Sequence, residues 1–108
     1  MEPVTLVHSY YEALDEGDYD RLDALLAPTF EQERSDRHFE SRDAFVEFMR
    51  EGRPQRDTEH VVDHVVADGD RVVAEGMLFD EDGDLWFRFA DVFRVEEGRL
   101  AHLRTYTL

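Results

Sequence analysis

The sequence has 108 residues, of which 42% are hydrophobic and 12% aromatic, enough for one globular domain with a single modest core. Its 27 acidic and 12 basic residues give a formal net charge of −15. That charge argues against nucleic acids and anionic membranes as partners, because no basic stripe is present to meet phosphates. There is no cysteine, so disulfides, thiol catalysis and thiolate metal sites are excluded.

Two helices are predicted at the start of the sequence. Apolar residues recur every three or four positions between Pro3, which suits the first turn of a helix, and Gly17, which suits its end. Asp18 suits the N-cap of a second helix, and Pro28 ends it.

The middle of the sequence predicts a short hairpin and a third helix. Residues 29–41, TFEQERSDRHFES, alternate weakly between apolar and polar residues and contain turn formers. Ser41 suits the N-cap of the third helix, and Gly52 ends it.

From about residue 58 the hydrophobic period changes from three or four to two. Four strand-like runs follow, separated by the turn sequences ADGD, DEDGD and EEGR. Short turns make neighbouring strands antiparallel. Three helices followed by such strands predict a single α+β domain over residues 1–108, with the helices packed on one face of an antiparallel sheet.

One acid interrupts the apolar face of a predicted strand, residues 87–95, FRFADVFRV. Alternation along a strand puts Asp91 on the same face as Phe87, Phe89 and Phe93. A carboxylate in such surroundings needs a structural partner or a function.

Three segments resemble parts of one known superfamily. Residues 10–30, YYEALDEGDYDRLDALLAPTF, resemble a helix–Gly-Asp–helix opening. Residues 41–49, SRDAFVEFM, are similar to its third helix, and residues 90–106, ADVFRVEEGRLAHLRTY, to its last hairpin. The superfamily is the NTF2-like one, and within it the chain most resembles SnoaL-like polyketide cyclases and ketosteroid isomerases. The resemblance covers nearly the whole chain and implies a cone-shaped pocket between the helices and a curved antiparallel sheet.

The resemblance implies roles for individual residues. In ketosteroid isomerases a tyrosine on the first helix and an acid on the penultimate strand form an oxyanion hole, and Tyr10 and Asp91 occupy these places. In SnoaL-like cyclases the equivalent acid is the main acid/base, which is again Asp91. The isomerases' general base is an aspartate after the second helix; an ungapped alignment places Arg34 there, and Glu33 and Glu31 are the nearby acids that another register would bring to the pocket. The resemblance therefore does not extend to standard ketosteroid isomerisation.

Inside such a cone, Asp91 is predicted to be a pocket acid. Apolar surroundings disfavour its charged form and raise its pKa, so that it donates to a carbonyl or enolate oxygen. The other residues predicted to line the pocket are Phe87, Phe89, Phe93, Met77, Glu75 and Arg34. Two alternatives remain at this point. Asp91 forms a buried structural pair with an arginine, such as Arg34 or Arg104, or with a backbone amide; or it lies on the opposite face or in a dimer contact.

No cofactor or metal site is predicted. His60 and His64 share the segment HVVDH, but on a strand they would lie about 13 Å apart, too far to bind one ion. The sequence also contains no phosphate-binding loop, nucleophile elbow or dinucleotide fingerprint.

Composition and the resemblance together suggest a setting for the protein. All 12 basic residues are arginine, and an acidic, lysine-free composition is similar to that of proteins from halophilic archaea, whose cytoplasm holds molar salt; we expect a cytoplasmic protein. The outer sheet face is predicted to carry Trp86 with Val72 and Leu78. Because the superfamily often dimerises through this face, a homodimer is expected.

Three functions remain open at this stage. The first is an isomerase, cyclase or hydrolase that acts on a small, apolar, carbonyl-bearing metabolite through Asp91 and Tyr10. The second is a module that binds such a molecule without catalysis. The third is a scaffold dimer with a vestigial pocket.

Overall fold

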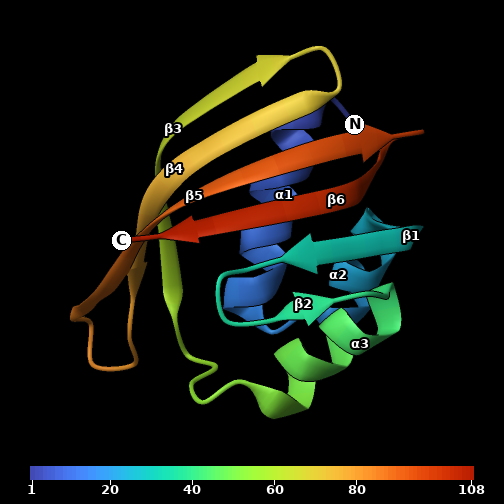
Figure 1. Ribbon diagram of the computed structural model, residues 1–108. Helices are drawn as coiled ribbons and strands as arrows, with labels where there is room; N and C mark the ends of the chain where they lie inside the picture. The colour runs from blue at the N-terminus through green and yellow to red at the C-terminus, as the bar shows by residue number, and fades with distance from the viewer.

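Three helices pack against one face of a six-stranded sheet in the computed structural model, which describes residues 1–108 (Figure 1). The helices are α1 (Pro3–Glu16), α2 (Tyr19–Leu25) and α3 (Arg42–Glu47), and α3 continues into a π-helical turn, Phe48–Gly52. The strands are β1 (Leu26–Glu33), β2 (His38–Phe39), β3 (Glu59–Asp68), β4 (Arg71–Phe79), β5 (Leu85–Glu96) and β6 (Arg99–Thr107). Their order across the sheet is β2-β1-β6-β5-β4-β3.

The predicted α+β class and the helix signals are confirmed. Gly17 adopts a left-handed φ of 67° and ends α1, a conformation that glycine reaches without steric cost. The side chain of Asp18 accepts a hydrogen bond from the Arg21 N–H and caps α2, and Ser41 caps α3 in the same way. The second helix ends earlier than Pro28, because the chain turns into β1 at Leu26.

The sheet is mixed, not wholly antiparallel as predicted. Strands β3 to β6 form the expected antiparallel series, and β1 and β2 form the short hairpin, with Glu33 opposite His38. β1, however, pairs with β6 in parallel. No short turn links these two strands, so the turn signals that set the other directions carry no information about this pair.

The sheet bends where β3 crosses β4. A Cβ atom on Gly76 would lie 2.3 Å from the backbone oxygen of Val61, so only glycine fits this close approach. Beside it the register of β3 shifts between Val62 and His64, and such bulges bend a strand. The bend curls the sheet around α1, so that the face toward the helices, here called the concave face, is hollowed (Figure 1).

The prediction that Glu75 and Met77 line the concave face is wrong. β4 pairs with β5 so that Ala74 lies opposite Asp91 and Gly76 opposite Phe89. Glu75 and Met77 therefore belong to the opposite, outer face. A shift of one residue exchanges the two faces of a strand, and both faces of β4 carry apolar residues, so alternation alone did not decide between them. The same shift places Val72 and Leu78, predicted on the outer face, on the concave face, where both are buried.

Trp86 also lies on the other side of the sheet from its predicted place. The register of β4 and β5 pairs Phe79 with Leu85 and Leu78 with Phe87, which leaves Trp86 as an extra residue in a bulge. A bulged residue escapes the alternation of its strand, and Trp86 turns toward the cavity between sheet and helices.

The core fills most of the space under the sheet. Phe30, Phe45 and Phe93 are fully buried within a cluster of 20 apolar residues. The ring of Phe93 packs edge-on against Tyr10, with ring centres 5.3 Å apart. Phe93 thus lies on the predicted face but belongs to the core and does not line the cavity. No helix has the length and apolar character to cross a membrane.

Candidate functional site

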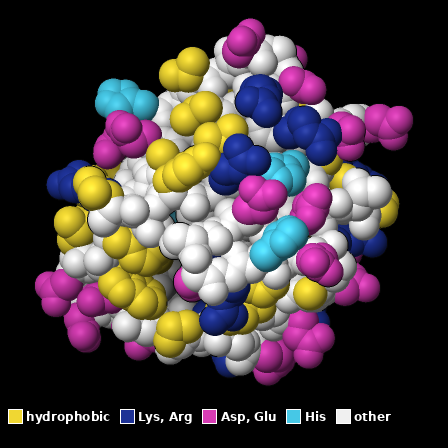
Figure 2. Space-filling view, viewed as in Figure 1, with side chains coloured by type: hydrophobic (Ala, Val, Ile, Leu, Met, Phe, Trp, Pro, Cys, Tyr) yellow, Lys and Arg dark blue, Asp and Glu magenta, His cyan; other side chains and the backbone are white.

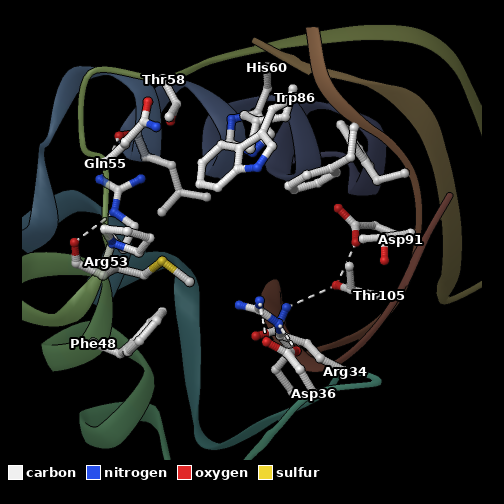
Figure 3. Close-up of a pocket in the computed structure, with 18 of the residues that line it drawn as sticks. Arg34, Asp36, Phe48, Arg53, Gln55, Thr58, His60, Trp86, Asp91 and Thr105 are labelled. Atoms are coloured by element: carbon white, nitrogen blue, oxygen red, sulfur yellow. Dashed lines mark hydrogen bonds and ion pairs between the residues drawn. The ribbon is translucent and has the colours of Figure 1, made fainter. Parts of the chain in front are cut away.

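A cavity of about 310 Å³ opens between the concave face, α1 and the turn that follows α3. This volume is at the lower end of the range for small-molecule sites. Seven of its lining residues form an apolar wall: Leu14, Phe48, Met49, Leu78, Trp86, Phe87 and Phe89. Figure 3 shows Asp91 and Thr105 along one side of the cavity and Trp86 and His60 along another. The predicted positions of Phe87, Phe89, Arg34, Tyr10 and Asp91 at the cavity agree with this lining.

Asp91 accepts hydrogen bonds on both of its carboxyl oxygens. The Tyr11 hydroxyl donates to Oδ2 at 2.6 Å, and the Thr105 hydroxyl donates to Oδ1 at 2.6 Å. Gln32 Nε2 in turn donates to Thr105 Oγ1 at 2.9 Å. Asp91 is 5% exposed, so this network holds the carboxyl group in one orientation at the cavity wall.

The network comes from strand pairing and one helix. Asp91 and Thr105 are direct partners in the β5–β6 ladder, and directly paired residues share a face of the sheet. Gln32 lies on the neighbouring strand β1, opposite Leu103. Tyr11 reaches the same point from α1.

Burial raises the pKa of Asp91 above its ordinary value, because loss of solvent disfavours the charged carboxylate. The hydrogen bonds from Thr105 and Tyr11 and the nearby His60 and Arg34 act in the opposite direction and limit the rise. Burial and the neighbouring Asp91 raise the pKa of Tyr11, so this phenol keeps its proton and remains a donor.

The tyrosine that donates to Asp91 is Tyr11, whereas the resemblance gave the oxyanion-hole role to Tyr10. Tyr10 lines the cavity and is 3% exposed, but its hydroxyl makes no hydrogen bond with a side chain. Adjacent residues on a helix point about 100° apart, so either tyrosine of the pair had the same sequence signal, and only tertiary packing distinguishes them.

Neither predicted arginine pairs with Asp91. Arg34 lines the cavity and forms a two-point ion pair with Asp36, at 3.0 and 3.1 Å. Arg104 lies on the outer face and binds Glu33 at 2.9 Å. The alternative of a buried Asp91–arginine pair is therefore wrong, and two uncharged hydroxyls hold the carboxyl group instead.

A second polar pair lies at the cavity, and the sequence patterns did not indicate it. His60, considered only as a metal ligand, lines the cavity, and its Nδ1 lies 2.6 Å from Asp15 Oδ1. The backbone N–H of His60 donates to Asp15 Oδ2 at 2.9 Å. No local motif links residues 45 positions apart; the link follows from α1 packing across the start of β3. No group of three His, Asp or Glu side chains is arranged to hold a metal ion.

Family comparison agrees with this architecture. The SnoaL-like domain family matches residues 7–103. The chain belongs to this family. A search of curated proteins finds no significant match.

Solved structures with this fold are similar over nearly the whole chain. An LEH-like epoxide hydrolase from M. tuberculosis has a TM-score of 0.87 at 24% identity, covering 99% of this chain and 83% of its own. An NTF2-like protein of unknown function from Cytophaga hutchinsonii has a TM-score of 0.86 at 17% identity, covering 100% and 91%. A proposed SnoaL-like polyketide cyclase from Jannaschia has a TM-score of 0.81 at 19% identity, covering 97% and 84%. At these identities the likeness shows the fold alone.

Proposed function

We propose that this SnoaL-like domain binds a small, mostly apolar metabolite in the cavity and carries out acid–base chemistry on it at Asp91. The observation that carries the proposal is a 5% exposed carboxyl group at the wall of an apolar cavity, held by two hydroxyl donors and without an arginine partner. Burying a carboxyl group costs free energy, and a cavity acid with a shifted pKa is a candidate functional residue.

The chemistry follows from this environment. Since burial raises the pKa of Asp91, its protonated form donates to a ligand's oxygen and its ionised form accepts a proton. The ligand class is a small ketone, enone or epoxide, whose oxygen gains charge during reaction and whose carbon frame fits the apolar wall. The similar structures include an LEH-like epoxide hydrolase and a proposed polyketide cyclase, and the name of the first specifies an epoxide as substrate.

A non-catalytic binding module is the second candidate. Arg34 favours this candidate, because it stands at the position of the general base in the ketosteroid isomerases that the chain resembles. Its guanidinium forms an ion pair with Asp36. In that case the cavity holds its ligand and Asp91 only orients the ligand's oxygen.

The experiment measures binding and turnover separately. Cyclohexanone and cyclohexene oxide are titrated against wild type and Asp91→Asn, with binding followed by the emission of Trp86, the only tryptophan, and by thermal shift. A ligand at 100 times its Kd stabilises a protein by about 2.7 kcal/mol, which a melting curve resolves. Binding by both proteins with turnover only by wild type is expected. Binding without turnover supports the second candidate, and no binding of apolar ligands refutes both.

We also propose that a second copy of the chain covers the outer face of the sheet. Val66, Val73 and Tyr106 are exposed large side chains on this face, and Figure 2 shows hydrophobic side chains gathered over β3 and β4 there. Trp86, which first suggested the dimer, does not lie on this face, so the proposal rests on the valines and the tyrosine. An isologous contact places equal patches of two copies together.

A further inference from the structure

We propose that His60, oriented by Asp15, is a second acid–base residue of the cavity and acts on the same ligand as Asp91. This inference rests on the proposed function, because it needs a ligand in the cavity. It supplies the base that Arg34 does not provide, and it narrows the substrate class to ketones that carry a hydrogen on the carbon next to the carbonyl.

The contact between His60 and Asp15 fixes which ring nitrogen is free. Asp15 Oδ1 lies 2.6 Å from Nδ1. An ionised carboxylate only accepts hydrogen bonds, so Nδ1 carries the proton of the neutral ring, and Nε2 keeps an unshared electron pair. The second oxygen of Asp15 receives the backbone N–H of His60 at 2.9 Å, which prevents the carboxylate from rotating away. Nε2 makes no hydrogen bond within the chain.

Helix α1 brings both acid–base groups to one place. Tyr11 and Asp15 are four residues apart in α1 and so lie on one face of the helix. Tyr11 donates to Asp91, and Asp15 holds His60. The imidazole lies 5.1 Å from the Tyr11 ring and 5.7 Å from the Phe89 ring, measured between ring centres. His60 and Asp91 both line the cavity, with the Tyr11 ring beside each of them.

The two groups complement each other for proton transfer. Nε2 of neutral His60 takes a proton from the carbon next to the carbonyl, and the electron pair of that C–H bond moves to form the enol double bond. The carbonyl oxygen takes the proton of protonated Asp91. His60 has then gained one proton and Asp91 has lost one. The carboxylate of Asp15 balances the imidazolium charge. Return of a proton from His60 to carbon, and of the enol proton to Asp91, restores both residues.

A structural link between β3 and α1 does not require the imidazole ring of His60. The hydrogen bond from the His60 backbone N–H to Asp15 already joins the two elements. The imidazole adds a second ring nitrogen, Nε2, on a residue that lines the cavity beside Phe89. Asp15 is a positioning residue in this scheme, because it acts through His60.

The test uses cyclohexanone in D2O. Incorporation of deuterium next to the carbonyl is followed by proton NMR, and binding is followed separately by the emission of Trp86. General-base catalysis typically contributes about 10²–10⁴-fold, so His60→Gln is expected to slow the exchange by at least about 100-fold with little change in ketone binding. His64→Gln is the matched control, because His64 lies on the outer face of the same strand, opposite Glu75, and it is expected to exchange at the wild-type rate.

Asp15→Asn tests the positioning role. In wild type the ¹⁵N shifts of His60 are expected to show the proton on Nδ1 over the pH range where the ring is neutral; in the variant the two tautomers are expected to mix, with slower exchange of the ketone. A structural tie alone would change stability without changing the tautomer.

The outcomes separate this inference from the proposed function. Ketone that binds but exchanges at equal rates in wild type and His60→Gln, or does not exchange at all, overturns the role of His60 and leaves ligand binding standing. If neither cyclohexanone nor cyclohexene oxide changes the Trp86 emission or the melting temperature, the proposed function and this inference are overturned together.

Discussion

The Tyr11 hydroxyl donates a 2.6 Å hydrogen bond to Asp91 across 80 residues of sequence. This contact ties α1 to the middle of the sheet and links stability to the candidate site. The adjacent Tyr10 is buried to the same degree and makes no such bond.

Replacing each of the two tyrosines by phenylalanine separates these roles. Tyr11→Phe leaves a buried carboxyl oxygen without a donor, which typically costs about 1–3 kcal/mol, and it raises the pKa of Asp91 further because a donor to the charged form is lost. Tyr10→Phe removes an unbonded hydroxyl and is expected to change stability by less than about 0.5 kcal/mol. Urea unfolding at neutral pH measures both. Equal effects of the two variants would contradict the assignment of the donor.

Asp91→Asn is expected to remove a pH dependence of stability. Because burial raises the pKa of Asp91, the folded chain holds this proton more tightly than the unfolded chain, in which the pKa is about 3.9. Wild type therefore loses stability as pH rises from the unfolded pKa to the folded one, and the loss is constant above that window. The variant has no carboxyl group to ionise at this position.

The measurement is the difference between the two melting temperatures as a function of pH. Taking the difference cancels the acids common to both proteins, including Glu33, whose pKa is lowered by its hydrogen bond with Arg104. The difference is expected to grow in favour of the variant through the window and then level off. Parallel curves would show that Asp91 titrates alike in both states.

Gly76→Ala is expected to destabilise the sheet by about 1–3 kcal/mol, because the new Cβ would lie 2.3 Å from a backbone oxygen of β3. Glu75→Ala is the control on the same strand: its side chain is exposed on the outer face, and a change within about 0.5 kcal/mol is expected. Thermal unfolding of both variants checks this. A mild effect of Gly76→Ala would mean that β3 moves away readily.

Salt is expected to stabilise the chain, since 27 acidic residues face only 12 basic ones. The Debye length falls from about 10 Å at 0.1 M to about 3 Å at 1 M, which screens the repulsion among the carboxylates. The melting temperature is expected to rise by more than about 5 °C, equivalent to about 1 kcal/mol. Screening saturates at moderate salt, so a rise that stays linear to high concentration would point to salting-out instead.

The outer face is expected to hold a dimer contact. Light scattering in molar salt would then give twice the 12.7 kDa chain mass. Val73→Glu places a charge in the exposed patch and is expected to give the monomer, whereas Glu97→Gln, in the turn between β5 and β6 and outside the patch, leaves the dimer intact. A monomer mass for the wild-type protein would contradict the dimer proposal.

Local sequence signals predicted where the helices and strands lie better than they predicted which elements contact one another. Gly17, Asp18 and Ser41 act through nearby backbone groups, so their sequence patterns predicted the helix boundaries. The acid at Asp91 stood out because an apolar strand face has few polar residues.

The features that the sequence patterns did not predict depend on tertiary packing. The prediction assigned the two faces of β4 the wrong way round, because both faces carry apolar residues. The bulge at Trp86 has no signature in a run of aromatic residues. The Asp15–His60 contact joins α1 to β3, so neither segment alone indicates it.

The position of β6 has a consequence for the order of folding. β6 is the last strand in the sequence but lies between β1 and β5 in the sheet, so the hairpin at one end and the three strands at the other are joined only when β6 enters. Such long-range closure is slow compared with local contacts. Asp91 and Thr105 meet across the β5–β6 ladder, and Gln32 joins from β1. The candidate site therefore assembles in the step that completes the sheet, and a partly folded chain has no preformed version of it.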